Sequence, residues 1–344
     1  MGPFRKAGRL GKLVPLITAG LVAACTQPAP STHGWAVVAH ITVGKNAGPV
    51  RLGGQWAFVP NMGDGTVTQV DRTSGKVAAT IPVSDPRAVL DQGCAPDSVH
   101  AYYSGSWGWR ACNTPYAIAW DGSSLWALDN GRMQLVLVDP VSHRATDHID
   151  LPGTGWDLAI SGTTAWVSGN DANRSLYKVD LRARRVVAAV SDLDQGSAAL
   201  AANSNGVWVV CARGETGHLD HVDPASGNVV GRYPIEWWST AVVANGGAVY
   251  VRGTNGGDIS RLDSATGALV WTQPGPGFIG NFGLDQLGMA ADGIWLSGPT
   301  TMRIDLASGK VAETIRLASN SAAAGNNELW LVLLDGSVVK LQTK

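Results

Sequence analysis

One pattern of apolar and polar positions recurs along the chain: a small or apolar residue, an aromatic residue, and then alternating apolar residues. Alternation with a period of two places successive side chains on opposite faces, so each copy predicts a β-strand. The aromatic residues of the seven copies are Trp56, Trp126, Trp166, Trp208, Tyr250, Trp295 and Trp330. Their spacings are 70, 40, 42, 42, 45 and 35 residues, so the repeat is regular except for a long first interval.

A second element follows most copies: an apolar strand that ends in Asp, a turn of small polar residues, and another strand. The Asp side chain can bond the backbone two residues on, and a closing Gly accepts the positive φ of the turn, so this element predicts a hairpin. Glycine closes the turns that follow Asp71, Asp223, Asp263 and Asp305. The turns after Asp139 and Asp180 lack that glycine, and we expect them to be longer or more strained.

Each unit therefore holds four short strands, which is the content of one β-propeller blade. A lone sheet cannot bury both faces, so we expect the blades to stack radially with the repeated aromatic residue in the wedge between neighbours. The seventh unit lacks a final strand, whereas residues 35–43 resemble a fourth strand. The sequence predicts an all-β, seven-bladed β-propeller of four-stranded antiparallel blades. The N-terminal strand joins the last blade and closes the ring, which removes exposed edges, and residues 34–344 form one domain.

The composition fits short strands joined by tight turns, with 43 Gly and 14 Trp among 344 residues. The 45% content of hydrophobic residues supports a packed core and excludes wholesale disorder. With a formal net charge of -1, the chain has no excess of the positive charge that is typical of nucleic-acid-binding proteins. We therefore expect a monomer with no nucleic-acid partner.

The first 25 residues have the form of an export signal, with positive charges in residues 5–12 and an apolar stretch over residues 13–24 that is too short to span a bilayer comfortably. The sequence Val22-Ala23-Ala24-Cys25 resembles the bacterial lipobox. The resemblance implies that Cys25 is lipidated and tethers the protein to a membrane on its extracytoplasmic side. The alternative is an ordinary secretory signal with a chance cysteine, and both interpretations export the protein. Residues 26–33 predict a flexible tether.

A run of residues in the first unit carries a family resemblance: Phe58-Val59-Pro60-Asn61, then residues 65–71, then residues 74–83. This run resembles the YVTN family of β-propeller repeats, and the other units resemble it more loosely. The resemblance implies a propeller over nearly all of the mature chain. It implies no single function, because this superfamily holds surface-layer proteins, ligand-binding modules, amine dehydrogenase subunits and a streptogramin lyase.

The motifs of two propeller chemistries are not met. The repeat that binds pyrroloquinoline quinone, Asp-x-x-Thr-Gly with Trp four residues after the Gly, fits only at residues 263–271. The Trp-Phe-Thr-Glu series of streptogramin-lyase-like repeats is absent. No nucleophile elbow, phosphate loop or zinc signature occurs either. We therefore assign no cofactor, no metal ligand and no catalytic residue.

Three cysteines follow Cys25 in the chain. Cys211 lies in a predicted strand, and we expect a buried free thiol. Cys94 and Cys112 lie in the long first interval, where residues 84–115 form a loop insertion without the repeat pattern. Disulfides persist in exported proteins, so we predict a Cys94–Cys112 bridge that contributes roughly 3 kcal/mol by the chain-entropy model. A metal site is a poor alternative because Cys and His do not cluster at ligand spacing.

Ligand sites of propellers lie around the central channel, on the face where loops between blades meet the loops of the mid-blade hairpins. Aromatic residues beside carboxylates and arginine in such loops suit a carbohydrate, a peptide or a ring-bearing metabolite. The candidate ligand-binding residues are Trp107, Trp109, Arg110, Trp156, Asp157, Glu236, Trp237, Trp238, Phe282 and Asp285. The alternative is that each tryptophan caps the blade below it.

The sequence thus predicts an exported, lipid-anchored binding module that recognises a ligand or an envelope protein through its loop-rich face. An alternative is a lyase or hydrolase in which Asp157, Glu236 and Asp285 pair as acid and base at the channel mouth, with or without a divalent ion. A third is a cell-surface scaffold with no small ligand. Convergent acids would favour the enzyme, and an aromatic surface without them would favour binding.

Overall fold

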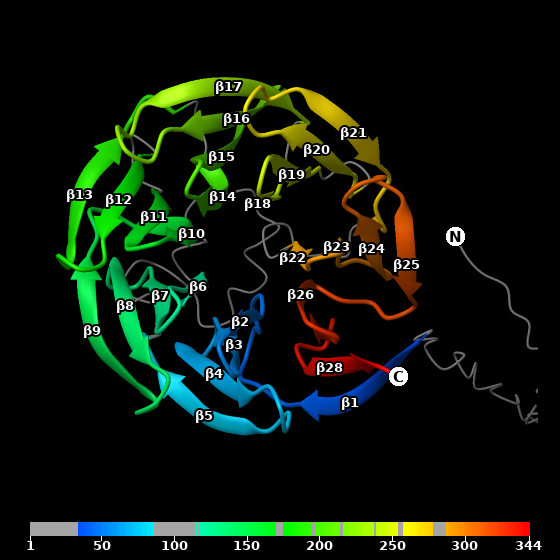
Figure 1. Ribbon diagram of the computed structural model, residues 1–344. Coiled ribbons are helices and arrows are strands. Elements are labelled where there is room, and N and C mark those ends of the chain that lie inside the picture. The colour runs from blue at the N-terminus through cyan, green and yellow to red at the C-terminus, as the bar shows by residue number, and fades with distance from the viewer. Residues whose placement is uncertain are drawn as a thin grey trace, which may run out of the picture. The chain divides into compact units, whose positions relative to one another are not determined.

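The computed structural model describes residues 34–85, 114–115, 117–169, 175–193, 197–213, 216–236, 239–253, 257–277 and 287–344. Every regular element in these ranges is a β-strand, and the strands form seven antiparallel sheets of four. The sheets follow one another around a ring, each with one strand near the centre and one at the rim (Figure 1). The predicted seven-bladed β-propeller is confirmed.

Blades 1 to 4 are consecutive along the chain, and each is ordered from the centre outward. Blade 1 consists of β2 (Arg51–Gly53), β3 (Trp56–Asn61), β4 (Thr66–Asp71) and β5 (Val77–Pro82). Blade 2 consists of β6 (Ile118–Trp120), β7 (Leu125–Asp129), β8 (Gln134–Asp139) and β9 (Arg144–Asp150). Blade 3 consists of β10 (Gly155–Ser161), β11 (Thr164–Gly169), β12 (Leu176–Asp180) and β13 (Arg185–Val190). Blade 4 consists of β14 (Ser197–Asn203), β15 (Gly206–Arg213), β16 (Thr216–Val222) and β17 (Val229–Ile235).

The remaining three blades include the one that closes the ring. Blade 5 consists of β18 (Ala241–Asn245), β19 (Ala248–Arg252), β20 (Ile259–Asp263) and β21 (Leu269–Gln273). Blade 6 consists of β22 (Gly288–Met289), β23 (Gly293–Leu296), β24 (Thr301–Asp305) and β25 (Val311–Ile315). Blade 7 consists of β26 (Ser321–Gly325), β27 (Glu328–Val332), β28 (Val338–Thr343) and, at the rim, β1 (Trp35–Ile41).

Strand β1 closes the ring as the sequence predicts. It pairs antiparallel with β28, with Trp35 opposite Thr343 and Ile41 opposite Val338. Trp35 also crosses to blade 6, where its ring packs edge-on against Trp295 at 5.6 Å and its indole N–H donates to Glu313. First and last strands therefore share one sheet, and the edge of β28 is covered.

The repeated aromatic residue of the second strand fills the wedge between neighbouring blades. Trp126 of blade 2 packs in one apolar cluster with Leu158 and Tyr177 of blade 3, and Trp166 of blade 3 packs with Val207 of blade 4. A polar side chain of the third strand lies opposite the aromatic ring in most blades. Lys178 lies 5.5 Å from the centre of the Trp166 ring, and such cation–π contacts add to the packing.

Blade 1 differs from the predicted pattern, because Phe58 rather than Trp56 occupies the wedge position. Phe58 lies opposite Gln69, two residues before the turn aspartate, as Trp166 lies opposite Lys178. Phe58 is fully buried, whereas Trp56 is half-buried and packs on the outside of the same cluster. The larger side chain suggested the wrong register by two residues.

The turns that lack glycine are strained rather than longer. His143 and Arg184 follow Asp139 and Asp180 at the same spacing as Gly75 follows Asp71, and they take positive φ values of 57° and 55°. A residue with a Cβ is disfavoured there, by about 1–2 kcal/mol. The backbone thus keeps one hairpin geometry in all blades that carry this turn.

The turn aspartates accept hydrogen bonds from the Ser or Thr that follows them. At Asp263 the hydroxyl and the backbone N–H of Thr266 donate at 2.8 and 2.9 Å, and these bonds lower the pKa of the carboxyl group. Bonds of the same kind lower the pKa of five further turn aspartates: Asp71, Asp139, Asp223, Asp305 and Asp335. The ionised form is the one that holds each turn.

Candidate functional site

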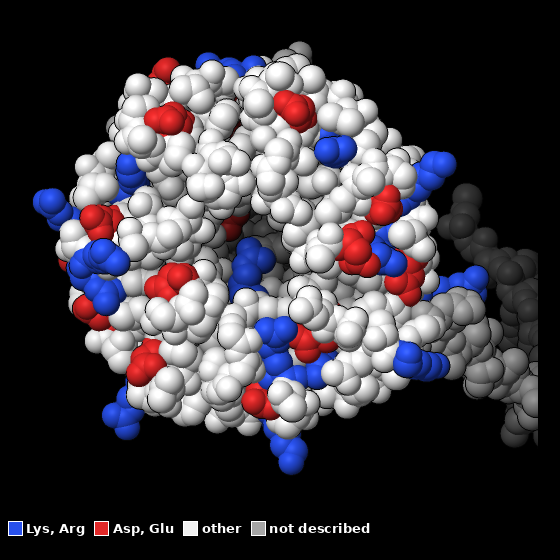
Figure 2. All heavy atoms as spheres, viewed as in Figure 1, with Lys and Arg blue, Asp and Glu red and all other residues white. Residues whose placement is uncertain are grey.

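The centre of the ring is hollow. Figure 2 shows a depression there with Lys or Arg atoms inside it and acidic atoms nearby. The innermost strands β2, β6, β10, β14, β18, β22 and β26 surround this central opening (Figure 1). The first residues of these strands lie on the face where the chain arrives from the preceding blade.

Arg51 is the first residue of β2, one of the innermost strands, and it is half-buried. Its Nε–H donates to the carbonyl oxygen of Ile118 on β6 at 3.2 Å, so the side chain reaches across to the next blade. Burial lowers the pKa of Arg51, and the negative charge of Asp157 on β10 acts in the opposite sense. The guanidinium stays protonated in any case. Sequence reasoning missed this residue, because a single Arg at the start of an apolar strand forms no motif.

Asp157 is held by backbone donors from two blades. Its carboxylate accepts the N–H of Leu158 and the N–H of Leu200 on β14, both at 2.8 Å. Its own N–H donates to the Ser168 hydroxyl at 2.9 Å. The pairing register shifts between Gly155 and Leu158 in β10, and β14 has a similar irregularity just before Leu200. Asp157 therefore ties together two irregular innermost strands, which is a positioning role.

Trp156 and Glu236, the other described candidates, face protein. Trp156 is only 7% exposed, as expected of a residue that caps a blade. Glu236 follows β17 and is half-buried; its carbonyl oxygen accepts the hydroxyl of Ser239 at 2.8 Å. A Cβ on Gly253 would lie 1.6 Å from Oε2 of Glu236, so the carboxylate rests on the hairpin of blade 5.

The other predicted residues lie outside the described part of the chain. These are Cys25, Cys94, Trp107, Trp109, Arg110, Cys112, Trp237, Trp238, Phe282 and Asp285. Their predicted roles stay predictions. Cys211 is described, and it is buried and not part of a disulfide, as the sequence predicts.

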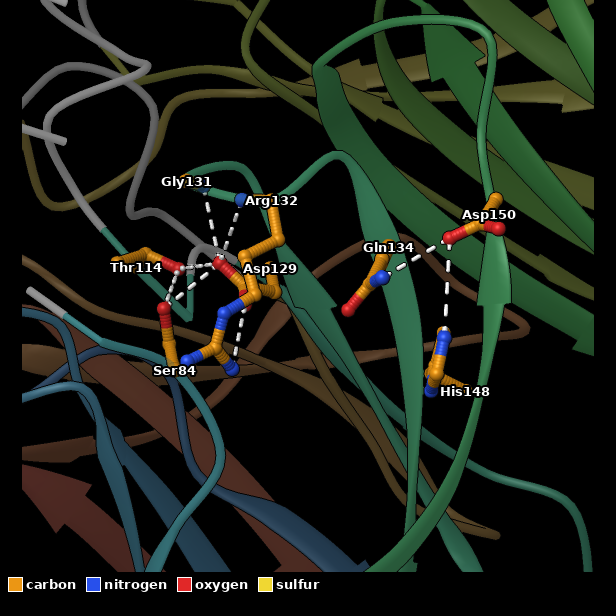
Figure 3. A network of polar contacts seen from close by, with 8 residues as sticks. All are labelled: Ser84, Thr114, Asp129, Gly131, Arg132, Gln134, His148 and Asp150. Carbon is orange, nitrogen blue, oxygen red and sulfur yellow. Dashed lines mark hydrogen bonds and ion pairs between the residues drawn. The ribbon is translucent and has the colours of Figure 1, made fainter. Parts of the chain in front are cut away.

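A buried aspartate near the predicted insertion was not recognised from the sequence. Asp129 ends β7, is fully buried, and accepts hydrogen bonds from the hydroxyls of Ser84 at 2.7 Å and Thr114 at 2.9 Å (Figure 3). The backbone N–H groups of Gly131 and Arg132 point at the same oxygen. Ser84 and Thr114 stand at the two ends of the predicted insertion, so Asp129 fixes where that segment leaves and rejoins the propeller.

A second polar group in Figure 3 lies on the outer part of blade 2. Gln134 donates to Asp150 at 2.9 Å, and His148 lies 3.8 Å from the same carboxylate oxygen. His148 and Asp150 are both well exposed, so this group belongs to the surface and is worth little.

Two features that could indicate a function are absent from the described ranges. No group of three or more His, Cys, Asp or Glu residues among them is arranged to hold a metal ion. None of the described segments forms a helix that is long and apolar enough to cross a membrane.

No family model matches the chain, and no curated protein matches it. Solved structures do match it. The chain is similar to hydrazine synthase of Kuenenia stuttgartiensis, with 15% identity, a TM-score of 0.66 and coverage of 88% of this chain and 97% of that one. It is similar to the β-propeller domain of Cps50 (Swd1) from Myceliophteria thermophila, with 11% identity, a TM-score of 0.69 and coverage of 90% and 100%.

A third similar structure is the WD40 β-propeller domain of Doa1, with 12% identity, a TM-score of 0.66 and coverage of 90% of this chain and 97% of that one. Identities this low show the fold alone. The class of protein is therefore a β-propeller, and the fold by itself does not assign a function.

Proposed function

We propose that this protein is a binding module, exported and anchored to a membrane by a lipid on Cys25, that recognises a ligand or an envelope protein with the loop-rich face around its central opening. The observation that carries this proposal is the hollow at the ring centre with basic atoms inside it (Figure 2). The innermost strands β2 and β10 carry Arg51 and Asp157, and the charge of Asp157 acts on Arg51. A rigid ring that holds a charged, concave centre is the general form of a recognition site.

The contacts of the described acids favour binding over catalysis. Asp157 holds backbone N–H groups of two strands, and Glu236 rests on Gly253. A general acid or base must be free to exchange a proton with the substrate, and a carboxylate that positions the backbone is poorly suited to this. The enzyme alternative gains no specific support from these residues.

The anchoring part of the proposal rests on the N-terminal sequence and needs its own test. The full chain and its Cys25→Ser variant should be produced in a bacterium, with the membrane and aqueous fractions compared. We expect the parent chain in the membrane fraction with the mass of a lipid added and the variant in the aqueous fraction. The same distribution for both would contradict the anchor.

Binding is tested by thermal unfolding of the purified Cys25→Ser chain against cell-wall carbohydrates, peptides and divalent ions with a chelator control. A molecule that binds only the folded state raises the melting temperature. At a concentration of a hundred times its Kd, it adds about 2.7 kcal/mol to the free energy of unfolding. A saturable shift with a carbohydrate or peptide supports the binding module. A shift confined to a divalent ion would instead favour the enzyme alternative.

A further inference from the structure

The guanidinium of Arg51 has hydrogen-bonding capacity that the fold does not use. An arginine carries five N–H donors, and one of them, at Nε, is satisfied by the carbonyl of Ile118. Within the described residues no acceptor is present for the terminal nitrogens. Arg51 as a whole is half-buried, so part of the residue stays in contact with solvent. The Nε–H contact places the guanidinium against β6, the innermost strand of the next blade.

The charge of Arg51 is unfavourable for the folded protein taken alone. Burial lowers the pKa of Arg51, which means that the surrounding structure disfavours the charged form. Asp157 offsets this in part, and its carboxylate also accepts two backbone N–H bonds. A half-buried charge with donors to spare suits the binding of an external group of opposite charge.

We propose that the terminal nitrogens of Arg51 bind the carboxylate group of a ligand that enters the central opening. This inference rests on the proposed binding function and names the chemical class that the opening selects. Two parallel N–H···O bonds match the planar fork to a planar carboxylate, and such bidentate pairs are both strong and directional.

Asp157 selects a single carboxylate over a more highly charged anion. Its fixed negative charge is near enough to act on Arg51, so it also acts on any anion bound there. Repulsion rises with the charge of the anion, and inorganic phosphate carries more negative charge at neutral pH than a carboxylate does. A ligand with one carboxylate, such as a peptide C-terminus or an organic acid, suits the pair of charges best.

The test uses sodium benzoate as the probe and benzamide as its neutral match in shape. The ¹⁵N resonance of the Arg51 Nε–H group, assigned by its loss in Arg51→Lys, should shift saturably with benzoate and stay unchanged with benzamide. Arg51→Gln should weaken benzoate binding by roughly ten- to a hundredfold, the effect of one hydrogen-bonded charge. Asp157→Asn should bind benzoate more tightly.

Arg144→Gln is the matched control, because Arg144 is an exposed residue of the rim strand β9 and its loss changes the net charge equally. Benzoate affinity should be unchanged in this variant. An equal affinity in Arg51→Gln and the parent chain overturns the proposal, as does the absence of a benzoate-dependent shift at Arg51. Tighter binding of inorganic phosphate than of benzoate overturns the preference for a carboxylate.

The titration of the parent chain decides the matter even if Arg51→Gln does not fold. A carbohydrate or peptide that stabilises Arg51→Gln and the parent equally, with no benzoate effect, would leave the binding module standing and remove the carboxylate site. A different result is benzoate binding at Arg51 together with a melting-temperature shift that only divalent ions cause. That result would support the carboxylate site and favour the enzyme alternative over the binding module.

Discussion

The wedges between blades and the central opening of the same ring are built by opposite rules. In the wedges one arrangement recurs, with a buried aromatic ring on the second strand and a partner on the third, as at Trp166 and Lys178. In the opening, Arg51 and Asp157 each occur once, in blades 1 and 3. Repeated positions make the fold, and positions that break the repeat are where a specific function can reside.

The energetic difference follows from the same contrast. A wedge tryptophan gains stability from complete burial. The charge of Arg51 loses solvation on folding, as its lowered pKa shows. Substitutions in the wedges should therefore change the stability of the protein, and substitutions in the opening should change ligand binding.

Loss of the closing strand should have the largest effect. A chain that begins at Gly44 lacks β1, so the edge of β28 is exposed and the Trp35–Trp295 contact is lost. We expect loss of cooperative thermal unfolding and association through the open edge, seen by circular dichroism and size-exclusion chromatography. A chain that begins at Gly34 is the control. Equal melting temperatures for the two chains would show that β1 is dispensable.

Replacing a buried wedge tryptophan should lower the free energy of unfolding far more than replacing a partly exposed tryptophan. Trp166→Ala should lower the free energy of unfolding by about 3–5 kcal/mol, because Trp166 is fully buried between blades 3 and 4. Trp56→Ala should cost about 1 kcal/mol, because Trp56 keeps part of its surface in water. Urea unfolding measures both. Similar costs would mean that Trp56 and not Phe58 fills the first wedge.

The next largest effect should come from loss of Asp129, the buried carboxylate that bonds both ends of the predicted insertion. Asp129→Ala removes the acceptor of the Ser84 and Thr114 hydroxyls and should cost about 1.5–3 kcal/mol in urea unfolding. The control is Asp150→Ala, because Asp150 is exposed and its loss should change stability by under about 0.5 kcal/mol. A neutral Asp129→Ala variant would contradict the positioning role.

Turn glycines should differ according to the space beside them. Gly227→Ala should cost about 1 kcal/mol, because φ is 75° and the new Cβ would meet Val190 at an ordinary 3.5 Å. Gly267→Ala should cost more, since its Cβ would lie 1.9 Å from the ring of Tyr233. Thermal unfolding compares the two variants, and equal losses would show that the ring moves aside freely.

Acid should weaken the turns mildly. The Thr266 hydroxyl and amide lower the pKa of Asp263 in the folded state, so this group stabilises the protein above its unfolded pKa of about 3.9. That contribution is lost as pH falls through the lower, folded pKa. We expect a melting temperature that is steady near pH 6 and declines below about pH 4, with a shallower decline in Asp263→Asn. An unchanged slope would assign the decline to other carboxylates.

The sequence predicts the fold well because the fold repeats. Seven copies average out local irregularity, so the blade count and the closing strand could be predicted, whereas the register of blade 1 could not, since Trp56 masks Phe58. The site is harder for the same reason. Asp157 was identified, but as a candidate ligand or acid rather than as the acceptor for Leu158 and Leu200. Arg51 gives no signal until the ring brings it beside β6 and β10.

The most direct test of this division measures stability and benzoate affinity together in two variants, Arg51→Gln and Trp166→Phe. The account predicts that Arg51→Gln melts at or above the temperature of the parent chain and loses benzoate affinity. It predicts that Trp166→Phe melts at a lower temperature and binds benzoate as tightly as the parent while folded. A destabilised Arg51→Gln variant with unchanged benzoate affinity would contradict it, because Arg51 would then be part of the fold and not of a site.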